Sequence, residues 1–391
     1  MPSAIRVDES KCLSTVMKLL SVPGVSGAER PVADEIMRML HAAGVPKGSM
    51  KIDHANRRMK MPRMTCGNLI VTLGGDRRSR RMFSAHMDTV TLVEGVKPVR
   101  RGRRIVSATD TALGADDRAG VGALVSGLRT VLERGLDHPP LTLVFTVGEE
   151  IGLLGARYID RKILGRVQCA FNFDGSGPRE FNLGAPSSDH FRIEVTGKAS
   201  HAGGAPELGV SAVAAASAAI ADLKDNGWFG KVVKGRRHGT SNIGSFVAES
   251  PTNIVSPRAV LEGESRSHWD PFLNKITSNF KRAFERACRR TRSADGHRAK
   301  ASFKSERIYT AFRLKASDPV VKLGVKAAEA AGLEVEMSVG GGGLDANYFN
   351  GYGVPTLTLG AGAHGAHTVT EHLDIKEHMA GCRMAAALMT V

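Results

Sequence analysis

Acidic or histidine-bearing segments follow apolar runs at five widely separated points of the chain. They span residues 84–90, 114–120, 146–152, 171–175 and 362–371. In an open parallel sheet, functional side chains gather beyond the carboxyl ends of the strands. One such segment would be compatible with an ordinary turn or helix start. Five of them constrain the fold, because a sheet that brings them together would create a metal site.

Apolar runs of strand length alternate with amphipathic patterns over the first part of the sequence. The runs predict strands at 68–73, 81–85, 141–147 and 167–173. Elsewhere apolar residues recur at three and four positions, which predicts helices at 10–20, 28–43, 119–133 and 155–164. Strands that alternate with helices predict an α/β fold, in which helices cover both faces of a mostly parallel sheet.

The pattern changes near residue 187 and returns after residue 310. Between these points we predict strands at 191–195, 241–247, 259–267 and 300–308, and helices at 209–222 and 271–290. This β-α-β-β-α-β order is that of a ferredoxin-like α+β domain. Afterwards come predicted helices at 319–331 and 346–350, a strand at 356–359 and a final helix from Ile375. We therefore predict a first α/β part over 1–187, an inserted domain over 188–309 and a second α/β part over 310–391.

The candidate ligands lie after predicted strands, in one case beyond a glycine-rich loop, or before a predicted helix. They are His86 with Asp88, Asp116 with Asp117, Glu149 with Glu150, Asp174 and His367. Adjacent carboxylates repel each other, and a bound cation relieves that repulsion. Each residue also has an ordinary structural interpretation, as a strand-end histidine, a helix cap or a turn. Because they coincide at strand ends, the sequence favours a metal site over separate structural roles.

Length and cysteine content limit the class of protein. A chain of 391 residues is long for one hydrophobic core, so two domains are expected. No apolar stretch approaches the roughly 18 residues that span a bilayer, and the first 20 residues lack the apolar block of a signal peptide. The five cysteines are scattered and include no Cys-x-x-Cys pair, a pattern typical of reduced thiols. We therefore predict a cytoplasmic protein that does not enter membranes.

The net charge of +15 includes three arginine clusters, within residues 77–81, 100–104 and 289–292. Paired arginines can neutralise phosphates, so one interpretation is binding to nucleic acid or another polyanion. The other interpretation is a set of solvated turns and helix faces. Aromatic residues make up only 5% of the chain and do not interleave with the clusters, which argues against stacking on bases. The sequence therefore argues against a nucleic-acid partner.

These motifs, in this order, resemble the superfamily of zinc-dependent aminopeptidases, carboxypeptidases and amidohydrolases with a dinuclear site. Within it, the resemblance is strongest to the tripeptide aminopeptidase (peptidase T) branch. It covers essentially the whole chain and is carried by residues 86–89, 113–120, 147–156, 200–206, 252–255, 263–268, 341–347 and 367–371. It implies a zinc-peptidase catalytic domain with an inserted lid and dimerisation domain.

The resemblance implies a role for each matched residue, beginning with the metal ligands. Asp116 would bridge two zinc ions, for which Mn²⁺ or Co²⁺ could substitute. One ion would be completed by His86 and Asp174, and the other by Glu150 and His367. The two ions would lower the pKa of a shared water and polarise the scissile carbonyl.

Further residues would support this chemistry. Asp88 would hold the neighbouring imidazole in its ligating tautomer, and Glu149 would act as the general base. The peptide Asp116–Asp117 is expected to be cis. His364 competes with His367 for the last ligand position, and the pattern His-Thr-x-x-Glu favours His367.

Residues of the inserted domain would complete the site. His201 would reach the active site of a second subunit and stabilise the oxyanion, which implies a homodimer formed through the inserted domain. Without the resemblance, His201 would be taken for a loop histidine. Arg266, assisted by Asn253, would bind a carboxylate or carbonyl of a short peptide substrate, unless it pairs with Glu262 or Glu264.

Three other positions concern the substrate or depart from the usual pattern. The glycine run that contains Gly341 would let the backbone approach a substrate, and it lacks the lysine of a phosphate-binding loop. Arg118 stands where lysine is common, and Trp269 interrupts the motif between His268 and Asp270.

The activity implied by the resemblance is zinc-dependent release of the N-terminal residue from tripeptides. A carboxypeptidase or an N-acyl amino-acid amidohydrolase would use the same dinuclear site on a different amide. A third hypothesis, from another class, is an inactive protein that binds a polyanion through its arginine clusters. All of the expected ligands and the base are present, which favours an enzyme.

Overall fold

The computed structural model describes residues 5–59, 61, 64–75 and 79–391, so the arginines at positions 77 and 78 lie outside the described residues. The chain folds into two compact units. The first unit consists of Met1–Gly184 and Arg313–Val391, and the second of Ala185–Phe312. The predicted insert, 188–309, begins and ends three residues inside the second unit.

The first unit is built around an eight-stranded sheet in the order β1-β2-β6-β3-β7-β17-β8-β16. Its strands are β1 (Met50–Ile52), β2 (Leu69–Leu73), β3 (Arg80–His86), β6 (Leu141–Thr146), β7 (Val167–Phe173), β8 (Glu180–Asn182), β16 (Glu336–Ser338) and β17 (Thr356–Leu359). The central pairs β6–β3, β3–β7 and β7–β17 are parallel, whereas β1–β2 and β2–β6 are antiparallel. Strand β6 is buried along its whole length, which explains its largely apolar sequence. The predicted α/β fold is confirmed.

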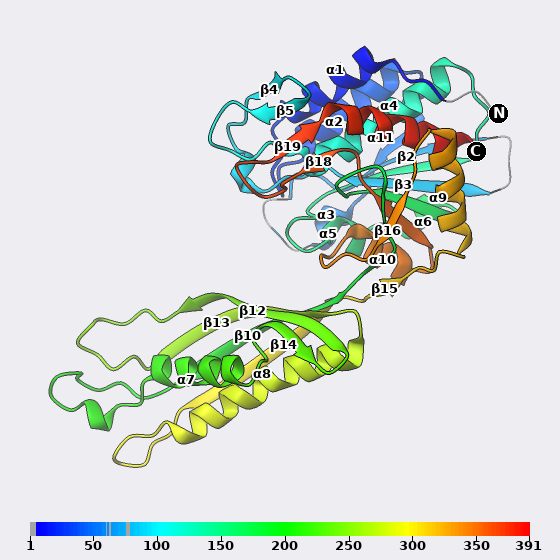
Figure 1. Ribbon diagram of the computed structural model, residues 1–391. Helices are drawn as coiled ribbons and strands as arrows, with labels where there is room; N and C mark the ends of the chain where they lie inside the picture. Colours follow the sequence, from blue (N-terminus) through cyan, green and yellow to red (C-terminus); the bar gives the residue numbers. More distant parts are fainter. Residues whose placement is uncertain (1–4, 60, 62–63, 76–78) are drawn as a thin grey trace. The chain divides into compact units, whose positions relative to one another are not determined.

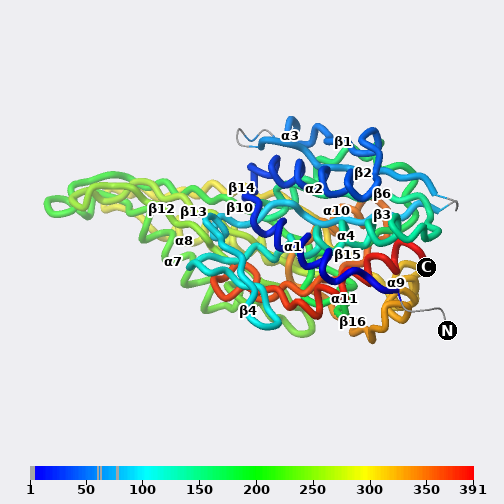
Figure 2. The backbone as a smooth tube through the Cα atoms, turned by 90° about the horizontal axis from the view of Figure 1, so that it is seen from above, coloured from blue at the N-terminus to red at the C-terminus, as the bar shows by residue number. Residues whose placement is uncertain are grey.

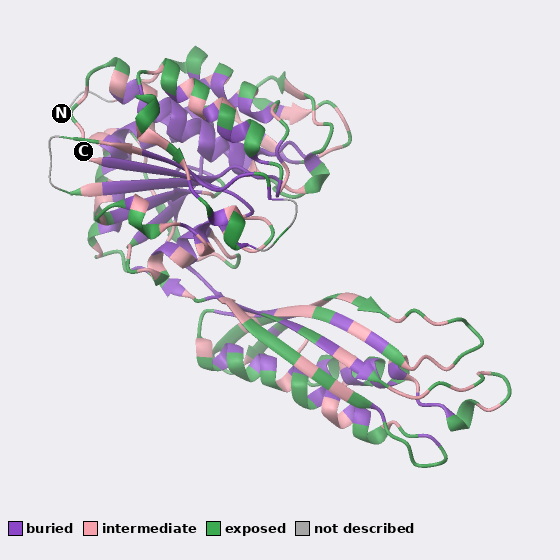
Figure 3. Cartoon of the chain, turned by 180° about the vertical axis from the view of Figure 1, so that it is seen from behind, coloured by how far each residue is buried: buried purple, intermediate pink, exposed green. Residues whose placement is uncertain are grey.

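Helices cover both faces of this sheet (Figure 1). One face carries α1 (Glu9–Leu20), α2 (Arg30–Ala42), α4 (Ala115–Glu133), α9 (Pro319–Ala330) and α11 (Ile375–Thr390). The other carries α3 (Ala55–Arg58), α5 (Leu154–Arg157), α6 (Arg161–Leu164) and α10 (Asp345–Gly351). Figure 2 shows α1 beside α11, so segments from opposite ends of the chain pack together. In Figure 3 the strands lie buried between the two helical layers.

The remaining elements of the first unit are short. A four-stranded sheet in the order β18-β19-β5-β4 contains β4 (Pro98–Arg101), β5 (Arg104–Ser107), β18 (Ala363–His364) and β19 (His372–Asp374). The arginines at 100, 101, 103 and 104 are exposed on the β4–β5 hairpin. Two 3₁₀ turns, η1 (Lys47–Ser49) and η2 (Thr91–Val93), complete this unit. Strands β9 (Gly184–Ala185) and β15 (Phe312–Arg313) lie at the points where the chain passes between the units.

The second unit is a five-stranded antiparallel sheet packed against two helices. Its strands lie in the order β11-β12-β13-β10-β14, with bounds β10 (Ser187–Thr196), β11 (Gly230–Lys234), β12 (Arg237–Val247), β13 (Arg258–Ser267) and β14 (Lys300–Tyr309). The helices are α7 (Ala212–Asp225) and α8 (Asp270–Arg290), and a 3₁₀ turn η3 spans Pro206–Leu208. Without β11, this is the order of a split βαβ sandwich, as predicted.

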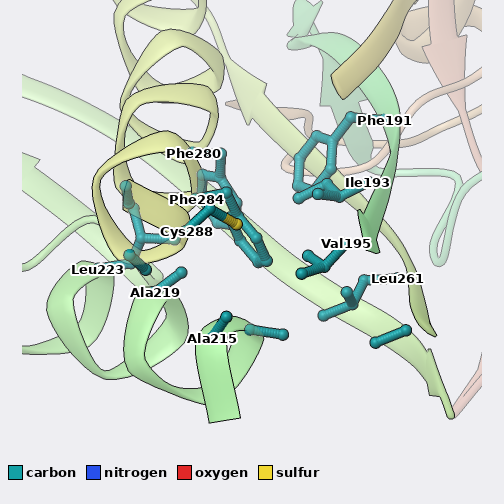
Figure 4. Packing of buried hydrophobic residues seen from close by; sticks show 14 of the residues in the cluster. Phe191, Ile193, Val195, Ala215, Ala219, Leu223, Leu261, Phe280, Phe284 and Cys288 are labelled. Atoms are coloured by element: carbon teal, nitrogen blue, oxygen red, sulfur yellow. The ribbon is translucent and has the colours of Figure 1, made fainter. Parts of the chain in front are cut away.

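The core of the second unit lies between its sheet and its helices (Figure 4). Alternate residues of β10, Phe191, Ile193 and Val195, face the helices because side chains of a strand alternate between its two faces. Helix α8 contributes Phe280 and Phe284, and the rings of Phe191 and Phe280 lie 4.7 Å apart. Helix α7 contributes small alanines, so the two helices pack closely on the sheet.

Two of the differences from the predicted secondary structure have a clear cause. The strand β11 was missed, because its five residues, Gly-Lys-Val-Val-Lys, contain only two apolar side chains and no longer apolar run. The helix predicted over 155–164 is two short helices, α5 and α6. It breaks at Asp160, whose side chain accepts a hydrogen bond from the N–H of Lys162 and so starts a new helix.

The structure adds two observations on composition. All five cysteines are free and buried. Among the described residues, no helix is both long enough and apolar enough to cross a bilayer.

His378 makes the first unit sensitive to acid. It is fully buried on α11, and its Nδ1 donates to the carbonyl of Ala361 at 3.1 Å. Burial lowers the pKa of His378 to about 4. An unfolded histidine binds a proton below about pH 6.5, whereas the folded one does not until about pH 4. Stability is therefore present above pH 6.5 and is lost as the pH falls toward 4.

A His378→Gln protein should accordingly be less sensitive to acid than the wild type. Between pH 7 and pH 5 we expect the free energy of unfolding to fall by about 2 kcal/mol more in the wild type. Urea titrations at both pH values, with chelator present so that metal release does not contribute, measure this difference. Equal losses in the two proteins would contradict it.

Candidate metal centre

The five predicted metal ligands meet in two groups in the first unit. One group is His86, Asp116 and Asp174, and the other is Asp116, Glu150 and His367. Within each group, the candidate ligand atoms lie within 4.8 Å of one another. Asp116 belongs to both: its Oδ1 lies 3.1 Å from His86 Nε2, and its Oδ2 lies 3.5 Å from His367 Nε2. The arrangement offers two adjacent cation positions that share one carboxylate.

Regular elements place these side chains at one edge of the sheet. His86 is the last residue of β3, Asp174 directly follows β7, and Asp116 lies in the first turn of α4. Glu150 lies in the turn after β6. Because β3, β6 and β7 are parallel neighbours, their carboxyl ends meet, which is the geometry expected from the sequence.

The His86 ring is buried and oriented by a backbone carbonyl. Its Nδ1 lies 3.0 Å from the main-chain oxygen of Asp88 and 3.5 Å from the carboxylate Oδ1 of the same residue. Since a carbonyl can only accept, Nδ1 of the neutral ring carries the proton and Nε2 is left to bind a metal. The closer partner is thus the carbonyl of Asp88, not the carboxylate that was expected.

The Asp88 carboxylate instead accepts hydrogen bonds from the turn after β6. It accepts hydrogen bonds from the N–H groups of Glu149 at 3.0 Å and Glu150 at 3.2 Å, and from the Ser26 hydroxyl at 2.7 Å. It therefore fixes the turn that carries both glutamates.

Burial and mutual repulsion raise the pKa values of two acids at this site, Asp174 and Glu149. Burial raises the pKa of Asp174 to about 7, and the carboxylate of Asp116 adds to the rise. Burial also raises the pKa of Glu149 well above its usual range, with Asp174 contributing. Acids that are costly to ionise side by side are stabilised by a cation. The carboxylate and imidazole donors therefore fit a pair of divalent ions such as zinc.

His367, and not His364, reaches the ligand groups. His367 Nε2 lies 2.8 Å from Glu150 Oε2, and this contact raises the pKa of His367 to about 9. Its φ of 64° lies in the left-handed region, which non-glycine residues adopt rarely and mostly at functional sites. His364 Nε2 instead lies 2.6 Å from Glu377 Oε2. This placement agrees with the preference for His367 as the last ligand.

Asp117 is not part of either ligand group. Its Oδ2 accepts the N–H of His86 at 3.1 Å, and its Oδ1 accepts the N–H of Gly120 at 3.0 Å. The Asp116–Asp117 peptide is cis, as the resemblance implied. Asp117 thus ties the start of α4 to the end of β3.

Glu371 supports the centre, although no separate role was predicted for it. Its buried carboxylate accepts the N–H groups of Leu113 at 2.8 Å, Gly114 at 2.7 Å and Asp116 at 2.9 Å. Three hydrogen bonds to one carboxylate hold the backbone that carries the shared ligand. The only signal in the sequence was the place of Glu371 at the end of the His-Thr-x-x-Glu pattern.

A Glu371→Gln protein should bind metal more weakly. The amide oxygen can accept only part of this three-way contact, so Asp116 loses its support. Residues that hold a metal ligand in place are commonly worth about 10–100-fold in metal affinity. Titration of metal-free protein with Zn²⁺ in competition with a chromogenic chelator measures the change. Glu377→Gln, on α11 and paired with His364, is the matched control; an equal effect there would contradict the assignment.

Glu29 supports the turn that carries the two adjacent glutamates. Its Oε1 accepts the N–H groups of Gly27 at 2.9 Å and Gly148 at 3.0 Å, and Gly148 directly precedes Glu149. Burial raises the pKa of Glu29 to about 7, with Asp88 contributing. Nothing in the sequence marks this residue, because its partner Gly148 is 119 positions away.

His201, predicted to stabilise an oxyanion, lies in the second unit and is exposed. Its Nδ1 accepts the N–H groups of Gly203 at 3.1 Å and Gly204 at 3.0 Å. The proton of the neutral ring therefore lies on Nε2, which becomes a hydrogen-bond donor. The role of His201 stays a prediction.

The candidates for substrate binding are Arg266, Asn253 and Gly341. Arg266 Nη2 lies 2.9 Å from Glu264 Oε2, so it forms one of the two ion pairs that the sequence analysis allowed. Asn253 is exposed, and like Arg266 it belongs to the second unit. A Cβ added at Gly341 would meet no described atom within 4 Å, so the chain itself does not require glycine there. The roles of these residues toward a substrate stay predictions.

Comparison with known proteins identifies relatives along the whole chain. Residues 82–391 match Peptidase family M20/M25/M40. A Bacillus subtilis protein described as uncharacterized protein YqjE is 32% identical over 386 residues, which is 98% of each chain. The aminopeptidase PepT from Bacillus cereus has a similar structure, with a TM-score of 0.83, 29% identity and 98% coverage of both chains. A tripeptidase from Staphylococcus aureus has a TM-score of 0.85, also with 29% identity and 98% coverage of both chains.

Proposed function

Because the chain belongs to Peptidase family M20/M25/M40, we propose that it is a dinuclear zinc aminopeptidase that releases the N-terminal residue of tripeptides. The family and the two structural neighbours support a peptidase, and the neighbours' names supply the substrate class. The observation that carries the proposal is the pair of ligand groups that share Asp116. A carboxypeptidase or amidohydrolase would use the same centre, so the amide that is cleaved must be tested.

The proposed residues divide the metal chemistry among them. His86 and Asp174 would hold one ion, Glu150 and His367 the other, and Asp116 both. Two bound divalent ions would polarise the scissile carbonyl and lower the pKa of a shared water. We propose zinc, with Mn²⁺ or Co²⁺ as substitutes, because carboxylate and imidazole ligands suit all three.

Glu149 is the proposed general base. It stands beside Glu150 in a turn fixed by Asp88, so its carboxylate is held close to the ligand groups without belonging to either. It would take a proton from the attacking water and deliver it to the leaving amine. Its raised pKa in the metal-free protein falls when cations bind nearby, because positive charge favours the ionised carboxylate.

The second unit is the proposed lid and dimerisation domain. In this proposal the Nε2–H group of His201 in one subunit donates a hydrogen bond to the oxyanion in the active site of another. The hydrogen bonds from Gly203 and Gly204 to Nδ1 support this role, because they leave the ring hydrogen on Nε2. Arg266 and Asn253 would bind the substrate's carboxylate or carbonyl, and Arg266 would then exchange Glu264 for the substrate. We place the enzyme in the cytoplasm, in keeping with its five free cysteines.

One tripeptide offered in three forms tests the reaction. We expect the free peptide to lose its N-terminal residue, and the N-acetylated form to resist cleavage, because an aminopeptidase requires the free amine. The C-amidated form should be cleaved slowly or not at all if a guanidinium binds the carboxylate. Chelator should abolish the activity, and Zn²⁺ should restore it. Products are identified by liquid chromatography with mass spectrometry.

The other outcomes are equally informative. Cleavage of the acetylated peptide would indicate that the protein is an acylase or a carboxypeptidase. No cleavage of any form by metal-loaded protein would contradict the proposal, and the exposed arginines of the β4–β5 hairpin would then direct the next test toward polyanions.

A further inference from the structure

A cavity of about 300 Å³ lies in the first unit, between the segment that follows α1, the turn η2 and the start of α4. Its walls are largely apolar and include Leu20, Val22, Val93, Val96 and Leu113. A volume of this size falls at the lower end of the range for small-molecule sites. Neither the ligand groups nor Glu149 lines it.

Arg118 lies at this cavity with most of its hydrogen-bonding capacity unused. The residue is 2% exposed, and a guanidinium carries five N–H donors. Two weak contacts are present, from Nη1 to the carbonyl of Leu19 at 3.4 Å and from Nη2 to the carbonyl of Gly24 at 3.2 Å. Nε has no partner among the described residues. The carboxylates of Asp88, Glu29 and Asp117 act on the guanidinium through their charge, without a hydrogen bond to it. Buried donors are rarely left without an acceptor, and an acceptor in the cavity would satisfy them.

The chemistry of the cavity defines that acceptor. An arginine fork matches the two oxygens of a carboxylate, which it can bind with two parallel hydrogen bonds. The apolar walls exclude a large polar group but accommodate a short hydrocarbon chain. From the unused donors of Arg118 and the apolar cavity beside them, we infer a binding site for a small carboxylate with an apolar chain, separate from the metal centre.

Glu94 bears on whether the ligand is an amino acid or a carboxylic acid without an amine. It lines the same cavity and is exposed, so it could accept an ammonium group at the entrance. A free apolar amino acid would place its carboxylate on Arg118 and its amine near Glu94. A carboxylic acid without an amine would use Arg118 alone. Leucine and 4-methylpentanoate distinguish the two, because they differ only by that amine.

Isothermal titration calorimetry of the metal-loaded protein tests the site with 4-methylpentanoate. Arg118→Lys keeps the charge and removes the fork, and Val96→Phe reduces the cavity volume while Arg118 itself is unchanged. We expect each variant to weaken binding on the order of tenfold to a hundredfold, and the neutral 4-methylpentanamide not to bind the wild type. Val96→Phe should also keep its metal content and melting temperature, which separates an effect on the cavity from a failure to fold.

Two results would overturn the inference. Equal binding by the wild type and both variants would place the acid elsewhere, such as on the metal ions. No heat of binding with the wild type would mean that water alone satisfies Arg118. If leucine binds more tightly than 4-methylpentanoate and Glu94→Gln removes that advantage, the ligand is an amino acid; equal affinities identify a simple carboxylic acid. The test measures binding only, so its outcome is independent of whether the protein cleaves tripeptides.

Discussion

A Glu149→Gln protein is expected to keep both metal ions and to lose about 10²–10⁴-fold in kcat. The reason is that Glu149 lies outside both ligand groups, whereas its neighbour Glu150 lies inside one. Glutamine has nearly the same shape as glutamate, so the backbone hydrogen bonds from Glu149 and Glu150 to Asp88 should persist. Without a carboxylate at this position, the attacking water has no group to take its proton.

Metal content by mass spectrometry and steady-state kinetics on one tripeptide measure the two effects separately. Glu150→Gln is the matched control, because the same chemical change one residue further on should reduce the metal content. If Glu149→Gln retained full activity, the assignment of the base would be wrong. If both variants lost metal equally, Glu149 would be a ligand.

The second large effect concerns the shared carboxylate. An Asp116→Ala protein is expected to lose both ions and, with them, measurable activity. One carboxylate oxygen faces His86 at 3.1 Å and the other faces His367 at 3.5 Å, so neither ligand group is complete without it. A His367→Ala protein removes a ligand from only one group and should retain more metal.

Zinc titration of metal-free protein, with activity assays after loading, distinguishes these variants. His364→Ala is the control from the same loop, since His364 pairs with Glu377 and should be dispensable for metal binding. Circular dichroism verifies that each variant is folded. Retention of two ions by Asp116→Ala would exclude it as the bridging ligand.

The elements that the sequence predicted well are those buried on both faces. Strand β7 was predicted over 167–173, the bounds that the structure has, because five of its seven residues are apolar and the run ends at Asp174. Strand β6 is likewise buried throughout, whereas helix α8 was predicted from an amphipathic pattern that buries only one of its faces. Strands β18 and β19 were missed because they are two and three residues long, too short for any periodicity. Their pairing depends on tertiary contacts that the local sequence does not encode.

The candidate ligands were recognisable for a related reason. Each belongs to a local pattern, such as a strand end followed by an acidic pair, that places it at the sheet edge. The supporting contacts were not predictable in this way. Glu371 accepts a hydrogen bond from Leu113, 258 positions away, and Glu29 reaches Gly148 across 119. The hydrogen bond from His86 to the carbonyl of Asp88 depends on backbone geometry that the sequence does not reveal.

The split of the first unit into two stretches of chain has a consequence for how the enzyme is made. Strand β17 sits inside the sheet between β7 and β8, and β17, His367 and Glu371 all follow the second unit in the chain. The ribosome synthesises a chain from its N-terminus, and domains generally fold as units once their residues have been synthesised. The uninterrupted second unit is therefore synthesised before β17, α11 and His367, which all belong to the first unit. The second group of candidate ligands cannot form before His367 has been synthesised.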